Sequence, residues 1–220
     1  MNLQSLRPAR DFAQNFGVKA LIFGAPGSAK TPLINTAPKP VLLACEPGLL
    51  SMKGSTVPTF QAFTPAAIDD FFKWFFSSAE TKNFDTIAID SVSQMADIYL
   101  QDALKSNKHG LKAYGEMATR SMEHLRQLYF TQYKHTYLIC KEMTFEGIKK
   151  PYFPGQQMLV EVPHMFDEIL HLGIHNIPGI GQLQSFQCRQ SSDILARDRT
   201  GQLAEFEPPD FGAIVKKAMG

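Results

Sequence analysis

A short segment rich in glycine and small residues constrains this chain more than any other part of its sequence. It follows the apolar run 18–23 and consists of Gly24, Ala25, Pro26, Gly27, Ser28, Ala29, Lys30 and Thr31. The apolar run predicts a buried strand, and Lys30-Thr31 is predicted to open a helix. The segment must therefore carry the chain through a tight turn from a strand into a helix.

The same segment resembles the pattern G-x-x-x-x-G-K-[ST], in which backbone N–H groups and a helix N-terminus bind phosphate oxygens. Lys30 is then expected to meet the β- and γ-phosphates of ATP, and the Thr31 hydroxyl to coordinate Mg²⁺. Ala29 stands where the pattern has glycine. A helical backbone at this position tolerates alanine, whereas a positive φ or a close backbone approach weakens nucleotide binding. The alternative is an ordinary glycine-rich turn.

Short apolar runs alternate with amphipathic stretches along the chain. Strands are predicted at 18–23, 41–45, 86–89 and 136–140, and helices at 66–78, 92–104 and 113–129. Beyond Phe166, short strands are expected at 169–174, 182–188 and 194–197, followed by a helix at 209–219. This order predicts one α/β domain over 1–220, with a mostly parallel central sheet flanked by helices and a C-terminal set of short strands or a hairpin. Residues 1–16 form an N-terminal segment and a candidate oligomerisation arm.

Composition narrows the setting of the protein. The formal net charge is +1, so overall charge does not point to a nucleic acid or a membrane. The sequence shows no signal-peptide pattern and no apolar run of about 18 residues, which favours a cytoplasmic protein with no membrane partner. Cys45, Cys140 and Cys188 are far apart and are expected to be buried free thiols.

Two predicted strands end in carboxylates. Asp90 closes the run I-A-I-D, as expected for a residue on the magnesium side of a neighbouring strand, although it could instead cap the next helix, as could Ser91. Glu46 closes the run 42–46 and is a candidate base for the water that attacks the γ-phosphate, or else a solvated turn residue. Lys141 follows the fourth strand and is a candidate γ-phosphate sensor, or else an ordinary exposed lysine.

The order of these features resembles the RecA-type core. Cys45-Glu46-Pro47-Gly48-Leu49 is similar to the segment of its catalytic glutamate, and the run 87–92, I-A-I-D-S-V, to its Walker B strand. The short spacing from Thr31 to Glu46 and the run 197–201, R-D-R-T-G, resemble compact RecA-like ATPases of phages, some of which anneal or recombine single strands.

This resemblance implies a RecA-like P-loop fold, ATP, Mg²⁺, single-stranded DNA and self-assembly into a ring or filament, with a single-strand-binding protein as a further candidate partner. It also implies that Glu46 is the general base and Asp90 the magnesium-side carboxylate. Ala29 departs from the family pattern, as does Lys141, because recombinases usually carry a neutral amide there.

A stretch that combines cations and aromatic rings follows the fourth strand. Within 144–154, Lys149 and Lys150 can meet phosphates, while Phe145, Tyr152 and Phe153 offer stacking surfaces for single-stranded DNA. The alternative is a β-hairpin whose aromatic residues belong to the core. A second candidate is the run 105–112, with Lys105, Lys108, His109 and Lys112, which could equally be a solvated helix connection.

Two arginines are placed for a role between subunits. Arg197 and Arg199 are expected at a hairpin tip, from which an arginine could reach the γ-phosphate of a neighbouring subunit; the alternative is a charged turn paired with Asp198. His164, His171 and His175 have spacings that would suit zinc only on one continuous helix, and Gly173 argues against that helix.

The function expected from the sequence is an ATPase that binds single-stranded DNA and promotes annealing or strand exchange. The alternative is a nucleotide-regulated assembly module with little or no hydrolysis, which Ala29 favours. A small-molecule kinase is a third candidate, but it would need an arginine-rich lid that the sequence lacks.

Overall fold

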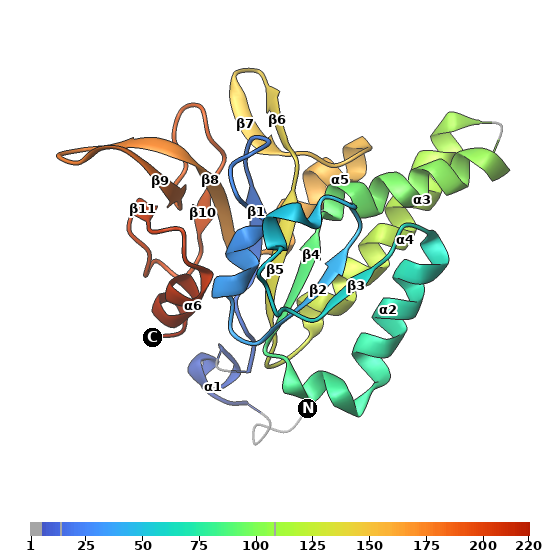
Figure 1. Ribbon diagram of the computed structural model, residues 1–220, viewed down its shortest axis with the longest axis horizontal. Helices are drawn as coiled ribbons and strands as arrows, with labels where there is room; N and C mark the ends of the chain where they lie inside the picture. Colours follow the sequence, from blue (N-terminus) through green and yellow to red (C-terminus); the bar gives the residue numbers. More distant parts are fainter. Residues whose placement is uncertain (1–5, 14, 108) are drawn as a thin grey trace.

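The structure is a computed structural model, and it describes residues 6–13, 15–107 and 109–220 (Figure 1). Within this part of the chain one nine-stranded sheet forms the centre of the molecule, in the order β11-β9-β8-β1-β5-β4-β2-β3, with β10 paired to β8. The strands are β1 (Lys19–Phe23), β2 (Pro40–Ala44), β3 (Thr59–Gln61), β4 (Thr86–Asp90), β5 (His135–Cys140), β8 (Glu168–Ile177), β9 (Gly181–Gln187), β10 (Arg197–Asp198) and β11 (Phe206–Glu207).

The strands β3, β2, β4, β5, β1 and β8 are all parallel, and the pairs β8–β9, β8–β10 and β9–β11 are antiparallel. The inner parallel strands are buried on both faces, which explains their continuous apolar runs. The mostly parallel α/β class predicted from the sequence is therefore confirmed. The polar residues that end the parallel strands gather at one edge of the sheet.

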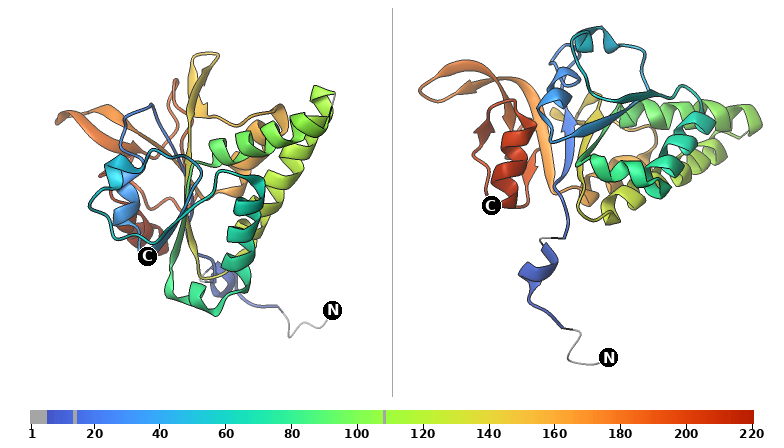
Figure 2. Two further views of the ribbon diagram at one scale, coloured as in Figure 1. Left: turned by 45° about the vertical axis from the view of Figure 1, so that its right-hand side comes forward. Right: turned by 60° about the horizontal axis from the view of Figure 1, so that its bottom comes forward.

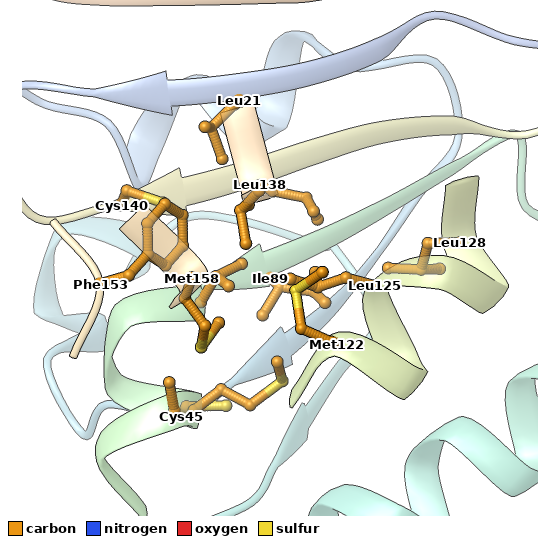
Figure 3. Packing of buried hydrophobic residues seen from close by; sticks show 14 of the residues in the cluster. Leu21, Cys45, Ile89, Met122, Leu125, Leu128, Leu138, Cys140, Phe153 and Met158 are labelled. Carbon is orange, nitrogen blue, oxygen red and sulfur yellow. The ribbon is translucent and has the colours of Figure 1, made fainter. Parts of the chain in front are cut away.

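Helices cover both faces of the sheet (Figure 2). On one face lie α2 (Pro65–Ser77), α3 (Val92–Ser106), α4 (Gly110–Phe130) and α5 (Gln156–Glu161). Figure 3 shows part of their core, in which Leu125 and Met158 pack near Leu138 and Ile89. The other face carries α6 (Phe211–Met219) and the 3₁₀ turn η2 (Pro32–Thr36). The predicted long helices are confirmed to within a few residues, and Thr64 caps α2 as expected.

The segment after the glycine-rich loop departs from its prediction. Lys30-Thr31 was expected to open a helix, but only the five-residue 3₁₀ turn η2 forms there. Pro32 fits a first helical turn because it needs no N–H partner. Pro38 and Pro40 follow closely, and residues before proline disfavour helical dihedrals. The three prolines therefore leave no room for a full α-helix.

The remaining elements are short. They comprise α1 (Ala9–Ala13), η3 (Leu49–Met52), η4 (Ala79–Asn83), η5 (Val162–Met165) and the separate hairpin of β6 (Glu142–Phe145) and β7 (Ile148–Pro151). Of the proposed N-terminal arm, residues 1–5 and 14 lie outside the described part, and the arm's role in assembly stays a prediction. The three cysteines are buried free thiols, as predicted. In the described part of the chain, every helix is too short or too polar to cross a membrane.

Candidate functional site

The loop that follows β1 needs glycine at its first position. A Cβ atom at Gly24 would lie 2.2 Å from the carbonyl oxygen of Leu172 on the neighbouring strand β8, so no side chain fits. Gly27 has φ +82°, a left-handed conformation that glycine adopts without steric cost. The loop is thus held tightly against the sheet at its start and turns sharply in its middle.

Ala29 adopts a left-handed backbone with φ +64°. The sequence left open whether this position is helical, and the structure shows that it is not. A residue with a Cβ costs roughly 1–2 kcal/mol in this conformation, which explains why the phosphate-loop pattern has glycine there. The substitution places strain directly before Lys30.

The Lys30 ammonium lies inside the loop. Its Nζ donates hydrogen bonds to the carbonyl oxygens of Gly24 (2.6 Å) and Ala25 (2.9 Å) and to Ser28 Oγ (3.2 Å). Burial lowers the pKa of Lys30, while the carboxylates of Asp90, Glu142 and Glu46 act in the opposite direction. One cation therefore stands among three acidic side chains from three different strand ends.

Thr31 and Asp90 are hydrogen-bonded, with Thr31 Oγ1 donating to Asp90 Oδ2 at 2.5 Å. The sequence predicted that Asp90 would lie on the strand next to β1, and this was wrong, because β5 lies between β1 and β4. Asp90 nevertheless reaches the loop because the loop bends across the end of β5. Ser91, and not Asp90, caps α3 by accepting a hydrogen bond from the Gln94 backbone N–H.

The oxygen atoms at this position suit magnesium. A hydroxyl and a carboxylate are hard donors of the kind that Mg²⁺ prefers, usually one or two protein groups together with phosphates and water. Within the described residues, no cluster of three or more His, Cys, Asp or Glu side chains could hold a metal by itself. Thr31 and Asp90 thus fit a magnesium ion that is shared with nucleotide phosphates. Burial raises the pKa of Asp90, while the Thr31 hydrogen bond lowers it.

Glu46 follows β2 and is held by Ser91. Ser91 Oγ donates to Glu46 Oε1 at 2.6 Å, and the neighbouring Cys45 N–H donates to the Asp90 carbonyl. These bonds fix the carboxylate at the same strand edge as Asp90 and Lys30. The structure therefore brings together the three residues on which the sequence based its phosphate site.

The Lys141 side chain, which follows β5, is directed toward helix α3. Its Nζ donates to Gln94 Oε1 at 2.7 Å and forms an ion pair with Asp97 at 3.4 Å, both on α3. The ammonium that was predicted to sense the γ-phosphate is therefore bound to α3 in this structure. The next residue, Glu142, lines the cavity beside the glycine-rich loop.

A row of hydrogen bonds that the sequence did not predict begins at Glu142. Its Oε2 pairs with His171 Nε2 (2.9 Å), His171 Nδ1 with His175 Nε2 (2.8 Å), and His175 Nδ1 with Ser185 Oγ (2.8 Å). Burial lowers the pKa of both histidines, that of His175 to about 4. The two histidines lie on a strand, where residues four apart share a face. Once the segment is predicted to be a strand, the spacing of four residues is the sequence signal that could have predicted this histidine contact.

The residues of 144–154 that were predicted to bind DNA have different surroundings in the structure. Phe153 is 1% exposed and belongs to the core, so its predicted stacking role is wrong. Tyr152 is half-buried, and its carbonyl oxygen accepts a hydrogen bond from Ser93 Oγ at 2.6 Å. Phe145 is 51% exposed and lies under Lys150, whose Nζ is 4.2 Å from the ring centroid.

The second predicted DNA segment lies elsewhere. The ends of α3 and α4 that face this segment lie away from the hairpin β6–β7 in Figure 1 and in the left view of Figure 2. Lys105 and Lys112 are exposed, and Lys108 lies outside the described residues. A DNA role for 105–112 stays a prediction.

The two arginines are not at a hairpin tip. Arg197 belongs to β10, which pairs with the start of β8 at the sheet edge opposite the glycine-rich loop. Its guanidinium donates to the carbonyl oxygens of Pro163 and Phe166, and Arg199 binds Asp167 at 3.0 Å. These contacts come from segments far away in the sequence, which is why local reasoning missed them. A role in a neighbouring subunit stays a prediction.

Two comparisons with known proteins found similar sequences or structures. Residues 17–200 match a family model described as an AAA domain. No curated protein matches the chain. Among solved structures, the chain is similar to a KaiC-like protein from the hyperthermophilic archaeon Pyrococcus horikoshii, with 14% sequence identity over 83% of this chain and 82% of that chain and a TM-score of 0.46.

Proposed function

Because the chain belongs to the AAA domain family of P-loop NTPases, we propose that it is a magnesium-dependent ATPase that binds single-stranded DNA and promotes annealing or strand exchange. One observation carries the proposal: Lys30, the Thr31–Asp90 pair and the Glu46–Ser91 pair meet at one sheet edge. The hairpin β6–β7, which bears two half-buried lysines and the exposed ring of Phe145, starts two residues after β5 at that same edge.

Each side chain has a separate task in hydrolysis. Backbone N–H groups of 25–31 and the Lys30 ammonium bind the phosphates. Thr31 and Asp90 would hold magnesium, which would supply positive charge to the phosphate oxygens. Glu46 orients the attacking water and accepts its proton, and Ser91 keeps this carboxylate in place.

Single-stranded DNA binds along the hairpin β6–β7. Lys150 supplies a cation and Phe145 an exposed ring, the combination that binds single strands with little sequence preference. The active form is a homo-oligomer, a ring or a filament, in the cytoplasm of a cell or of a phage-infected host. A single-strand-binding protein is a further partner in this scheme.

A second function follows from Ala29. Its left-handed backbone strains the loop immediately before Lys30, which favours a module in which nucleotide binding controls assembly and turnover is slow or absent. The two functions share the nucleotide site and differ in the rate of hydrolysis and in the DNA reaction that hydrolysis would serve.

The test is ATP turnover measured with and without single-stranded DNA, alongside direct ATP binding. In Glu46→Gln, we expect turnover to fall by about 10²–10⁴-fold while ATP still binds, because only the proton acceptor is lost. Lys30→Ala should lose binding, and Glu205→Gln, an exposed carboxylate, serves as the matched control.

The outcomes separate the proposals. DNA-stimulated turnover that is lost in Glu46→Gln supports the ATPase. ATP binding with no turnover supports the assembly module. If the wild-type protein binds no nucleotide, both functions are overturned.

A further inference from the structure

The two adjacent lysines of β7 lie on opposite faces of the hairpin. Thr144 pairs with Lys149, and Glu142 with Pro151, so Lys149 shares a face with Glu142. Met143 pairs with Lys150, and Phe145 with Ile148, which places Lys150 beside Phe145 on the other face. The strand alternation therefore gives two neighbouring cations different surroundings.

The face that carries Lys149 borders the glycine-rich loop. Lys149 and Glu142 line a cavity of about 480 Å³ together with His171 and the loop residues 25–28. The backbone of Lys149 is fixed on both sides, because its N–H donates to the Asp193 carbonyl (2.7 Å) and its carbonyl accepts from the Leu195 N–H (2.9 Å). These bonds hold the hairpin so that the side chain faces the cavity.

The charges around this cavity leave Lys149 available for an anion. Among the described residues no carboxylate lies within ion-pair distance of its ammonium, and the Glu142 carboxylate is bound by His171 at 2.9 Å. Lys141, by contrast, pairs with Asp97, and Lys150 lies over the Phe145 ring. A triphosphate beside Glu142 would meet an unfavourable negative charge, which the Lys149 ammonium at the same cavity offsets.

We propose that Lys149 is a ligand of the terminal phosphate of a bound nucleoside triphosphate, so that the hairpin β6–β7 distinguishes ATP from ADP. The proposal rests on the nucleotide site of the proposed function. The terminal phosphate is the one in reach because Lys149 lines the same cavity as Ala25 and Ser28, which both accept hydrogen bonds from the Lys30 ammonium. Lys30 is the residue that meets the β- and γ-phosphates.

This assignment also links the nucleotide to the DNA surface. The two faces of one short ribbon carry the phosphate ligand Lys149 and the DNA-binding pair of Lys150 and Phe145.

The experiment compares equilibrium affinities for ATPγS, a slowly hydrolysed triphosphate, and for ADP, both with Mg²⁺ and without DNA. In Lys149→Ala, ATPγS affinity should fall by about 10-fold or more, because a charge-assisted hydrogen bond is lost, while ADP affinity stays at the wild-type value. Unchanged ADP binding also shows that the variant is folded. Lys149→Arg should restore most of the preference for ATPγS.

Lys150→Ala is the matched variant on the opposite face. It should keep the wild-type ratio of ATPγS to ADP affinity and lose affinity for single-stranded DNA. An unchanged ATPγS affinity in Lys149→Ala, or an equal loss for both nucleotides, overturns the assignment while the nucleotide site stands. Wild-type protein that binds neither nucleotide overturns the proposed function and this assignment with it.

Discussion

Thr31 and Asp90 are joined by a 2.5 Å hydrogen bond. Thr31 lies in the loop after β1 and Asp90 ends β4, and these two strands are not neighbours in the sheet. The loop that carries Thr31 crosses the end of β5 to reach the end of β4. Asp90 is 9% exposed, so this bond lies in a region where electrostatic interactions are stronger than in water. The bond fixes the relative position of two oxygen atoms of the kind that magnesium prefers.

Replacement of Asp90 by Ala should uncouple magnesium from nucleotide binding. Wild-type ATP affinity is expected to rise with Mg²⁺ concentration, and the concentration of Mg²⁺ needed should increase by about 10–100-fold in the variant. Isothermal titration at several Mg²⁺ concentrations measures this directly. Asp97→Ala, on α3, is the matched control, and an equal effect of both variants would contradict a metal role for Asp90.

Ala29→Gly should stabilise the protein. Glycine removes the cost of the left-handed conformation, about 1–2 kcal/mol, and adds about 0.4–1 kcal/mol of unfolded-state entropy, so a net gain of about 0–1.6 kcal/mol is expected. For a chain of this size the melting temperature rises by about 2–4 °C for each kcal/mol gained. Ala25→Gly, in the same loop but without a positive φ, should lower it. A melting temperature that falls in both variants would show that Ala29 is not strained.

Glu168 makes the stability of the fold depend on pH. Its side chain is fully buried without a hydrogen-bond partner for either oxygen, and burial, with Asp198 and Asp167, raises its pKa from 4.5 to about 8. Because the pKa is raised in the folded state, the fold favours protonated Glu168, and ionisation of this side chain lowers the free energy of unfolding. The contribution is therefore fully present below about pH 4.5 and is lost as the pH rises through about 8.

Glu168→Gln should remove this dependence. The amide cannot ionise, so the variant should melt at a higher temperature than the wild type at pH 8.5 and show a much smaller difference at pH 5. Melting curves at the two pH values measure the effect, and Glu205→Gln, an exposed glutamate, controls for general charge. A difference between variant and wild type that does not change with pH would be evidence against the buried carboxyl.

Phe153 and Phe145 should respond in opposite ways to truncation. Phe153→Ala removes a core ring and should cost about 3–5 kcal/mol of unfolding free energy. Phe145→Ala removes a ring that is 51% exposed, so it should change stability little but weaken single-stranded DNA binding by about 1–3 kcal/mol. Chemical denaturation and a DNA-binding titration of both variants test this. A normally stable Phe153→Ala would contradict its place in the core.

The sequence by itself predicted most elements of this fold and the sheet edge at which the candidate phosphate site lies. Local sequence patterns predict the strands around Ile22, Leu43, Ile89 and Leu138 and the helices between them. This is possible because apolar runs and the helical period of 3.6 residues depend only on residues that are close together in the sequence. Glu46 and Asp90 were found for the same reason, since a polar residue at the end of a buried parallel strand must lie at the carboxyl edge of the sheet.

Tertiary structure decided which way the neighbouring side chains face. Whether Lys141 or Glu142 faces the loop, and whether Phe153 lies in the core, depends on elements brought from elsewhere in the chain. The row from Glu142 to Ser185 forms only because β8 lies beside β1 and β9 folds back on β8. A local sequence pattern predicts the backbone conformation of the segment in which it occurs. The partners of a side chain are set by packing between distant segments, which no short stretch of sequence contains.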